Sequence, residues 1–233
     1  MIIHKLAWRF IRHGDDPCFY ALQARDTVEW LAGEGVELSG DVSALDLGAG
    51  LGLIGEELRK RACRVTYADE ADCLLPELDH YPVTLLNLDS DDLEALGQYD
   101  LVICSNVLEH LSRPEHFISI VDRIVAPGGR LYLSWTNWLS PWGGHEFSPF
   151  HYLGPRLGPR VYDRVMRKPR KHTPYTNLFP TAIGRTLKWL EANPGLKTVR
   201  VVPRYYPELA GLVRVPIARE FLTWNCAVLL EKA

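Results

Sequence analysis

The sequence has few cysteines, and they are not arranged as a disulfide framework or a zinc site would require. The 233 residues include five cysteines, an odd number, widely scattered and without a C-x-x-C pair. Disulfide-rich secreted domains need closely spaced pairs, and zinc sites need clustered cysteine and histidine residues. We therefore expect reduced thiols and a cytoplasmic protein.

Long apolar runs are also missing. No run approaches the ~20 apolar residues of a membrane-spanning helix, and the N-terminal stretch MIIHKLAWRFIRH is interrupted by His4, Lys5 and Arg9. This stretch lacks the continuous apolar core of a signal peptide. Its apolar residues recur at helical spacing, which fits a helix packed on the domain or an amphipathic helix resting on a membrane surface. The sequence predicts no membrane span and leaves weak peripheral membrane association open.

A strong excess of one charge is absent as well. Lys and Arg number 26 and Asp and Glu 29, for a formal net charge of −3, and 47% of the residues are hydrophobic. These values are those of an ordinary globular protein, so disorder is not expected. Nucleic acid is not the expected partner. We predict a single domain over residues 1–233, with no signal for its oligomeric state.

Apolar runs of strand length alternate with helical patterns through residue 136. A helix over residues 16–31, opened by Asp16-Pro17, belongs to an N-terminal helical region, 1–40. A core region, 41–136, then contains five predicted strands, with helices at 53–61 and 114–125; the strands are 43–47, 64–68, 83–88, 99–104 and 130–135. Such alternation predicts an α/β fold whose parallel sheet has helices on both faces.

The residues after 136 lack this regular alternation of strands and helices. Residues 137–179 are rich in proline, glycine, aromatic and basic residues, with one helical pattern at 156–167. A long irregular connection after the fifth strand is typical of a lid or binding loop. The last region, 180–233, holds a helix and two strands, 198–202 and 221–230, which we expect to pair antiparallel because the connection between them is irregular.

The run LDLGAGLG predicts a ligand site. Gly48, Gly50 and Gly52 follow a buried strand directly, where glycines allow a tight turn and close approach of a ligand to the backbone. A dinucleotide-binding G-x-G-x-x-G also fits, but the Asp46 carboxylate would repel a pyrophosphate and attract a cationic ligand. A P-loop is excluded because no G-K-[ST] follows.

These residues resemble motif I of the class I S-adenosylmethionine-dependent methyltransferases. Similarity continues in the right order through VTYADEAD, LLNLDSDDL, YDLVICSNVLEHL and APGGRLYLS. More distantly, GGHE…HYLG, PRYYPE and REFLTWN resemble a group of bacterial methyltransferases of generic description. The resemblance implies a Rossmann-like, seven-stranded, mostly parallel sheet with a final antiparallel pair, and S-adenosyl-L-methionine as the cofactor.

The resemblance also assigns residues to that cofactor. It implies that Asp69, or less favourably Glu70, binds the ribose hydroxyls, that Asp89 contacts the adenine amino group, and that Ser105 and Asn106 lie near the methionine end. The other implied cofactor-binding residues are Asp46, Gly48, Ala49, Gly50 and Gly52 of the glycine turn and Tyr20 of the preceding helix, which as a core aromatic needs no such role.

The acceptor side is concentrated in SPWGGHEFSPFHYLG, residues 140–154. Relatives that methylate DNA adenine or protein glutamine carry [DN]-P-P-[YFW] after the fourth strand, where this chain has SNVLEH. A hydroxyl acceptor instead needs a base, and histidine titrates nearest to neutral pH. We predict His145 as the general base, oriented by Glu146 or His151, although these side chains could equally tie down an aromatic loop by hydrogen bonds.

No metal is expected. Glu109 and His110 resemble part of an E-x-x-E-H run in quinone-ring O-methyltransferases, but Asn106 stands where the first glutamate would be. Loss of a carboxylate weakens a site for a hard cation such as magnesium.

Residues 154–172 contain seven Arg or Lys and one acid, Asp163. They form either a solvated basic helix or a site for phosphate or carboxylate on the acceptor. We predict O-methylation of a small molecule, sugar, or glycolipid or natural-product precursor, possessing an anionic group or bound to a carrier. An N- or C-methyltransferase and a non-catalytic module that binds S-adenosylmethionine or NAD remain as alternatives.

Overall fold

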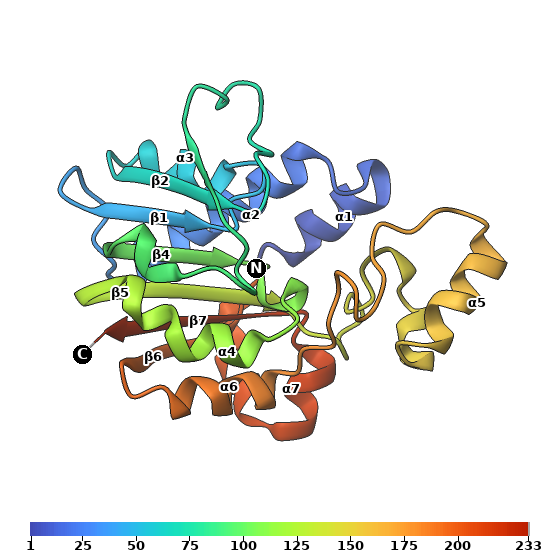
Figure 1. The fold of residues 1–233 in the computed structure, drawn as a ribbon. Helices are drawn as coiled ribbons and strands as arrows, with labels where there is room; N and C mark the ends of the chain where they lie inside the picture. Colours follow the sequence, from blue (N-terminus) through green and yellow to red (C-terminus); the bar gives the residue numbers. More distant parts are fainter. Residues whose placement is uncertain (233) are drawn as a thin grey trace.

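The computed structural model describes residues 1–232, and a seven-stranded sheet forms its centre (Figure 1). The strand order is β3-β2-β1-β4-β5-β7-β6, and β7 runs antiparallel to both of its neighbours. The strands are β1 Ser43–Leu47, β2 Arg64–Asp69, β3 Val83–Leu85, β4 Tyr99–Ser105, β5 Val125–Thr136, β6 Leu196–Pro203 and β7 Asn225–Lys232. The predicted Rossmann-like sheet with a final antiparallel pair is confirmed.

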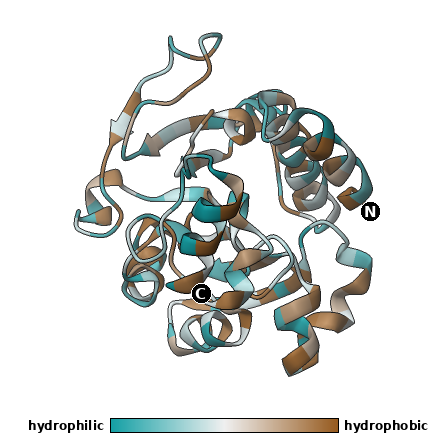
Figure 2. Ribbon diagram, turned by 90° about the vertical axis from the view of Figure 1, so that its right-hand side faces the viewer, coloured by the Kyte–Doolittle hydropathy of each residue, from teal (hydrophilic) through white to brown (hydrophobic). Residues whose placement is uncertain are grey.

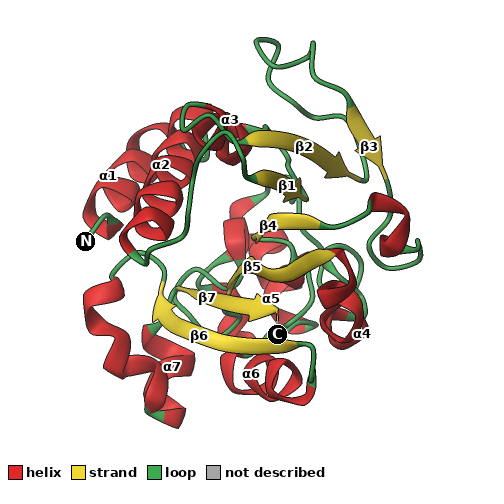
Figure 3. Cartoon of the chain, turned by 90° about the vertical axis from the view of Figure 1, so that its left-hand side faces the viewer, coloured by secondary structure: helices red, strands yellow, loops and turns green. Residues whose placement is uncertain are grey.

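Helices cover both faces of the sheet, because successive strand residues point to opposite sides and both sides are apolar. Leu101 and Ile103 of β4 pack with α2 and α3, whereas Val102 and Cys104 pack with α4 and α6. Figure 3 shows these two groups of helices on opposite sides of the sheet. The helices are α1 Ile3–His13, α2 Pro17–Gly33, α3 Leu53–Arg59, α4 Pro114–Ile120, α5 Leu157–Met166, α6 Ile183–Ala192 and α7 Pro216–Leu222. These helices carry both hydrophobic and hydrophilic residues, as helices with one face on a core require (Figure 2).

The start of α2 is set by local sequence. The Asp16 side chain accepts a hydrogen bond from the amide of Phe19 at 2.8 Å, and Pro17 occupies the first helical position, where its missing N–H has no intrahelical partner to lose. This start is the one predicted from the sequence.

Residues 137–179 form a separate layer beyond the carboxyl ends of the strands, with α5 standing away from the sheet (Figure 1). Their own small core consists of Trp138, Phe147, Tyr162 and Leu178. Two 3₁₀ turns, His145–Phe147 and Phe150–Leu153, carry two of the three histidines of this segment, and His172 follows α5. The segment is therefore packed on itself as well as on the sheet edge.

Three strand boundaries differ from the prediction by three or more residues. The fifth strand begins at Val125, five residues early, because the predicted helix at 114–125 ends at Ile120 and a 3₁₀ turn follows it. The third strand ends at Leu85, three residues early. A last strand beginning at Phe221 is wrong: Phe221 lies in α7, and β7 begins at Asn225. Pro216 starts that helix with its fixed φ angle, and the first two residues of the predicted strand lie exposed on it, with Leu222 57% exposed.

None of the helices described between residues 1 and 232 has the length and apolar character needed to cross a bilayer.

Candidate active site

A cavity of about 910 Å³ lies at the carboxyl ends of β1 and β4. Its walls come from α1, α2, the glycine turn after β1 and the segment that follows β5. The topological switch point of an open α/β sheet, where neighbouring strands connect in opposite directions, is the usual place for a ligand. Here that point lies between β1 and β4, directly at the cavity.

The glycine turn adopts a backbone that other residues rarely tolerate. Gly48 and Gly50 have φ angles of 71° and 51°. A Cβ atom on Gly48 would come within 2.3 Å of the Val107 side chain, whereas one on Gly50 would have no atom within 4 Å. Packing therefore requires glycine at position 48, and the space beside Gly50 is open to the cavity. Ala49 also lines it.

Asp46 lies beneath this turn and is 2% exposed. Its Oδ2 atom accepts a hydrogen bond from the amide of Gly55 at 2.8 Å, which fixes the start of α3. Burial raises the pKa of Asp46 to about 7, and the nearby Asp69 carboxylate acts in the same direction. A cationic ligand in the cavity would favour the ionised form.

Asp69 at the end of β2 ties the first two strands together. Its Oδ2 atom accepts from the amide of Gly50 at 2.7 Å and its Oδ1 atom from the amide of Glu70. Asp69, Glu70 and Gly52 do not themselves line the cavity. The carboxylate nevertheless sets the position of the glycine that does.

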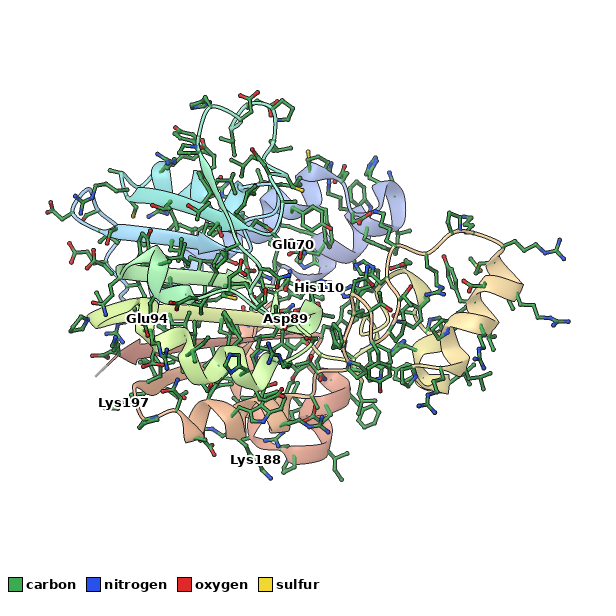
Figure 4. All side chains as sticks on the ribbon, viewed as in Figure 1. Glu70, Asp89, Glu94, His110, Lys188 and Lys197 are labelled. Atoms are coloured by element: carbon green, nitrogen blue, oxygen red, sulfur yellow. The ribbon has the colours of Figure 1, made fainter. Side chains whose placement is uncertain are left out.

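Asp89 lies on the same edge of the sheet as Glu70 and His110 (Figure 4). Its carboxylate accepts hydrogen bonds from the amides of Ser112 and Arg113, at 2.9 and 3.1 Å. It too lies outside the cavity wall. In this structure the side chain holds the loop before α4.

Ser105 and Asn106 end β4 and line the cavity. Asn106 has a left-handed backbone, with φ of 58°. Its Oδ1 atom accepts from Asn225 at 2.7 Å and from Arg204 at 3.2 Å, and its amide nitrogen reaches Gln23. Ser105 shares a hydrogen bond with the hydroxyl of Ser134 on β5.

Arg204 is a cavity residue that the sequence did not reveal. It is 4% exposed, donates to Thr27 at 2.9 Å, and has no carboxylate within ion-pair distance among the residues described. Its Nε atom has no partner. In the sequence, the one signal for Arg204 was its position just after a predicted strand end, in PRYYPE.

Three imidazoles meet on the opposite wall, and we call His110, His145 and His172 the histidine cluster. Their ring centroids are 4.5 to 5.6 Å apart. His110 follows β4, His145 follows β5, and His172 follows α5. His172 was not predicted, because nothing in its local sequence distinguishes it from the other residues of the basic segment, residues 154–172.

Hydrogen bonds hold two of these rings. Nδ1 of His110 lies 2.7 Å from the carbonyl oxygen of Asn177, and Nδ1 of His172 lies 2.6 Å from Oε2 of Glu146. The other Glu146 oxygen accepts from the amides of Lys171 and His172. His145 has a φ angle of 48°, and its Nε2 atom is buried without a hydrogen-bond partner.

The protonation states follow from this environment. Burial, together with the neighbouring imidazoles His172 and His110, lowers the pKa of His145 to about 3. Although burial opposes ionisation of Glu146, its hydrogen bonds from His172 lower its pKa to about 2. At neutral pH His145 is uncharged and Glu146 is a carboxylate.

The expected pairing of His145 with Glu146 or His151 is not found. Glu146 pairs with His172 because the chain returns past it after α5. His151 is fully buried, and its Nε2 atom lies 3.0 Å from the carbonyl oxygen of Ser140. It packs beneath Gly144, outside the cavity wall, and therefore ties down the loop.

Aromatic side chains form another part of the wall. Trp142 stacks on Trp224 with centroids 6.1 Å apart and contacts Phe10 of α1 edge-on at 4.2 Å. Tyr20 of α2 also faces the cavity, and burial raises its pKa to about 12. This surface suits a flat or apolar group.

The basic segment is divided between two environments. Arg170 forms an ion pair with Asp163, and Lys171 reaches Asp15 of the N-terminal region at 3.2 Å. Lys168 and Lys171 line the cavity. The remaining basic residues of α5 are largely exposed, as expected of a solvated helix.

Comparison with known proteins agrees with this geometry. The family described as a methyltransferase domain matches residues 45–131. An uncharacterized methyltransferase of Mycobacterium ulcerans is 32% identical over 230 residues, covering 93% of this chain and 88% of the relative.

Two solved structures have the same fold. An S-adenosylmethionine-dependent methyltransferase from Mesorhizobium loti has a TM-score of 0.58 at 19% identity, covering 89% of this chain and 98% of that chain. The magnesium protoporphyrin IX methyltransferase of Synechocystis, with bound S-adenosylhomocysteine, has a TM-score of 0.53 at 18% identity, covering 99% and 94%.

Proposed function

The chain belongs to the class I S-adenosylmethionine-dependent methyltransferases, and on that premise we propose that it methylates a hydroxyl group of a small molecule. The observation that carries this proposal is the histidine cluster, which places proton-accepting imidazoles in the wall of the cavity that the glycine turn also lines. Oxygen acceptors need such a base, whereas relatives that methylate conjugated amines carry a [DN]-P-P-[YFW] motif that this chain lacks after β4.

The residues around the glycine turn fit S-adenosyl-L-methionine. The space beside Gly50 is open, and Asp46 supplies a buried carboxylate that a cationic ligand would stabilise. We assign the cofactor to Gly48, Ala49, Gly50, Ser105, Asn106 and Tyr20 in the wall, with Asp46 beneath them. Gly52, Asp69, Glu70 and Asp89 complete the proposed site from the rim. Figure 4 shows Glu70 and Asp89 on the same edge of the sheet.

When bound, the cofactor supplies an electrophilic methyl group, whose C–S bond breaks as the C–O bond to the acceptor forms. The cavity residues position the acceptor oxygen and remove its proton. His172 suits the second task because its Nδ1–H donates to the Glu146 carboxylate, leaving Nε2 free to accept. His145, with a pKa of about 3, is a weak base and lines the site as a neutral ring.

The acceptor is proposed to combine a flat or sugar-like body with an anionic group. Trp142, Trp224 and Phe10 offer an apolar surface, and Lys168, Lys171 and Arg204 offer positive charge on different sides of the same cavity. Residues 137–179 act in this proposal as the lid that carries half of these groups. A cytoplasmic location is part of the proposal, supported by the five unpaired cysteines.

The experiment is to identify the product. The protein is incubated with labelled S-adenosylmethionine and a panel of hydroxyl, amine and carbon nucleophiles, each with and without a carboxylate or phosphate. O-methyl products, assigned by mass spectrometry and NMR, are expected, with anionic acceptors preferred. N- or C-methyl products alone would contradict the proposal, and tight binding of NAD without S-adenosylmethionine binding in calorimetry would contradict the cofactor assignment.

A further inference from the structure

The histidine cluster has the layout of a metal centre. One ligand nitrogen from each of His110, His145 and His172 lies within 4.8 Å of the other two. In a tetrahedral zinc site with Zn–N bonds of about 2.1 Å, ligand nitrogens are about 3.4 Å apart. Small side-chain rotations would bring the three nitrogens to that spacing. We propose that the cluster binds one divalent transition-metal ion, with zinc as the best match.

Hydrogen bonds leave the correct nitrogens available. Nδ1 of His110 and Nδ1 of His172 are occupied by a carbonyl oxygen and by the Glu146 carboxylate, so each Nδ1 carries its proton and each Nε2 presents a lone pair. Metal-bound histidines characteristically donate their other ring N–H to such an oxygen, which fixes the ring and the tautomer. Glu146 would therefore be a positioning residue for the site.

The third histidine supplies an independent observation. The Nε2 atom of His145 is buried and has no hydrogen-bond partner, which is unusual for a polar atom in a folded protein. A metal ion between the rings would give this atom a partner.

Hydrogen bonding within the cluster does not explain it. Between residues 1 and 232, no hydrogen bond joins any two of the three rings, which lie face to face or tilted. Three imidazoles that contact one another without exchanging a proton gain little from their proximity. Coordination of one ion would give the Nε2 atom of each ring a partner.

The ligand set also indicates the kind of ion and site. Imidazole nitrogens suit zinc and other first-row transition metals, whereas magnesium prefers oxygen. This site differs from the magnesium site considered at Glu109, whose carboxylate accepts from the amide of Thr136 and is 1% exposed. Three protein ligands in a cavity wall leave a fourth position open, as in catalytic zinc sites.

The catalytic consequence rests on the proposed function. An acceptor hydroxyl in the open position would be acidified by the ion and would release its proton to solvent, with His172 then serving as a ligand in place of a base. The metal site itself does not depend on this step. Binding can thus be tested without an acceptor.

The test is metal binding to the intact protein after chelator treatment. Co²⁺ titration followed by visible absorption, and Zn²⁺ titration by calorimetry, are expected to show one ion per chain in a tetrahedral environment. His145→Ala and His172→Ala should each weaken binding by about 100-fold or more, and Glu146→Gln by about 10- to 100-fold. His116→Ala, at an exposed position on α4, is the matched control and should bind as the wild type does.

Circular dichroism and thermal unfolding of each variant establish that it is folded; Glu146→Gln keeps the shape of the side chain and serves if an alanine variant does not fold. Absence of binding, or equal binding by the His145→Ala and His116→Ala proteins, would overturn the inference. If no ion binds and O-methyl products form, the metal site is wrong and the proposed function stands. If an ion binds and the products are N-methylated, the metal site stands and the proposed O-methylation is wrong.

Discussion

Asp46 illustrates how single residues acquire new properties at this site. In the sequence, Asp46 is a carboxylate before a glycine turn. In the folded protein it lies beneath the turn, is 2% exposed and accepts a hydrogen bond from the amide of Gly55. Burial raises the pKa of Asp46, whereas hydrogen bonds from His172 lower the pKa of Glu146. The same functional group thus serves as a buried, protonatable support in one wall and as a permanent carboxylate in the other.

The raised pKa of Asp46 predicts a pH-dependent stability. Its pKa is 3.8 in the reference state and about 7 in the folded protein, so the folded state binds the proton more tightly. The contribution of this group to the free energy of unfolding is fully present below pH 3.8 and is lost as the pH rises to about 7, by at most a few kcal/mol. Asp46→Asn removes the ionisation, so its stability relative to wild type should increase between pH 4 and pH 7.

Urea unfolding of both proteins at half-unit pH intervals measures this difference. A constant difference across that range would show that the Asp46 pKa is not raised. The change is a difference between two chains, so titration of other groups cancels in it.

At the scale of elements, the turn between β1 and α3 connects the cofactor side of the cavity to the histidine cluster. Gly48 lies against Val107, which directly precedes the 3₁₀ turn that ends in His110. Gly50 faces open space, and its amide is held by Asp69. The two glycines therefore differ: packing against Val107 requires Gly48, whereas Gly50 borders the open space that we propose for the ligand.

Gly48→Ala and Gly50→Ala are predicted to differ accordingly. Both place an L-residue at a left-handed position, which costs about 1–2 kcal/mol of folding free energy. Gly48→Ala adds a clash with Val107 worth roughly another 1–3 kcal/mol. Gly50→Ala should mainly weaken S-adenosylmethionine binding, because the new methyl group occupies the open space.

Denaturant unfolding and calorimetric titration separate these outcomes. Val107→Ala in the Gly48→Ala background is the control, since removing the opposing methyl groups should restore part of the stability. Equal destabilisation by the two glycine variants would contradict the assigned packing role of Gly48.

At the scale of the whole molecule, segments from distant parts of the chain cover the cavity together. Phe10 of α1 contacts Trp142 of the segment after β5, and Lys171 forms an ion pair with Asp15. These contacts link the N-terminal region to residues 137–179 across the cavity mouth. Ligand binding should therefore order both covers at once.

Hydrogen exchange with S-adenosylhomocysteine tests this coupling. Amides in residues 3–13 and 140–172 should exchange more slowly in the complex, while those of β4 and β5, already protected in the sheet, should change little. Phe10→Ala should reduce the protection of residues 140–172. Protection confined to the glycine turn would show that the two covers act independently of the cofactor.

The fold and the place of the glycine turn at the carboxyl edge of the sheet were predictable because they depend on local order. Strand-length apolar runs, Asp46 and the glycines occur at intervals imposed by successive β-α units, and the parallel arrangement brings their ends to one edge. The last strand was misplaced at Phe221, because a short apolar run fits a strand or an amphipathic helix equally well until Pro216 is seen to start a helix.

The acceptor side of the cavity depends on contacts between segments that are distant in the sequence. His172 lies outside any motif, and PRYYPE and REFLTWN, which contain Arg204 and Asn225, gave no sign that these side chains reach the cavity. The three residues come from separate segments without shared periodicity. Sequence could indicate that His145 and Glu146 lie near the cofactor edge, but the partner of Glu146 depends on where the chain returns after α5. Repeating secondary structure encodes the sheet and its cofactor edge in neighbouring residues, whereas long-range packing of loops brings the three histidines together.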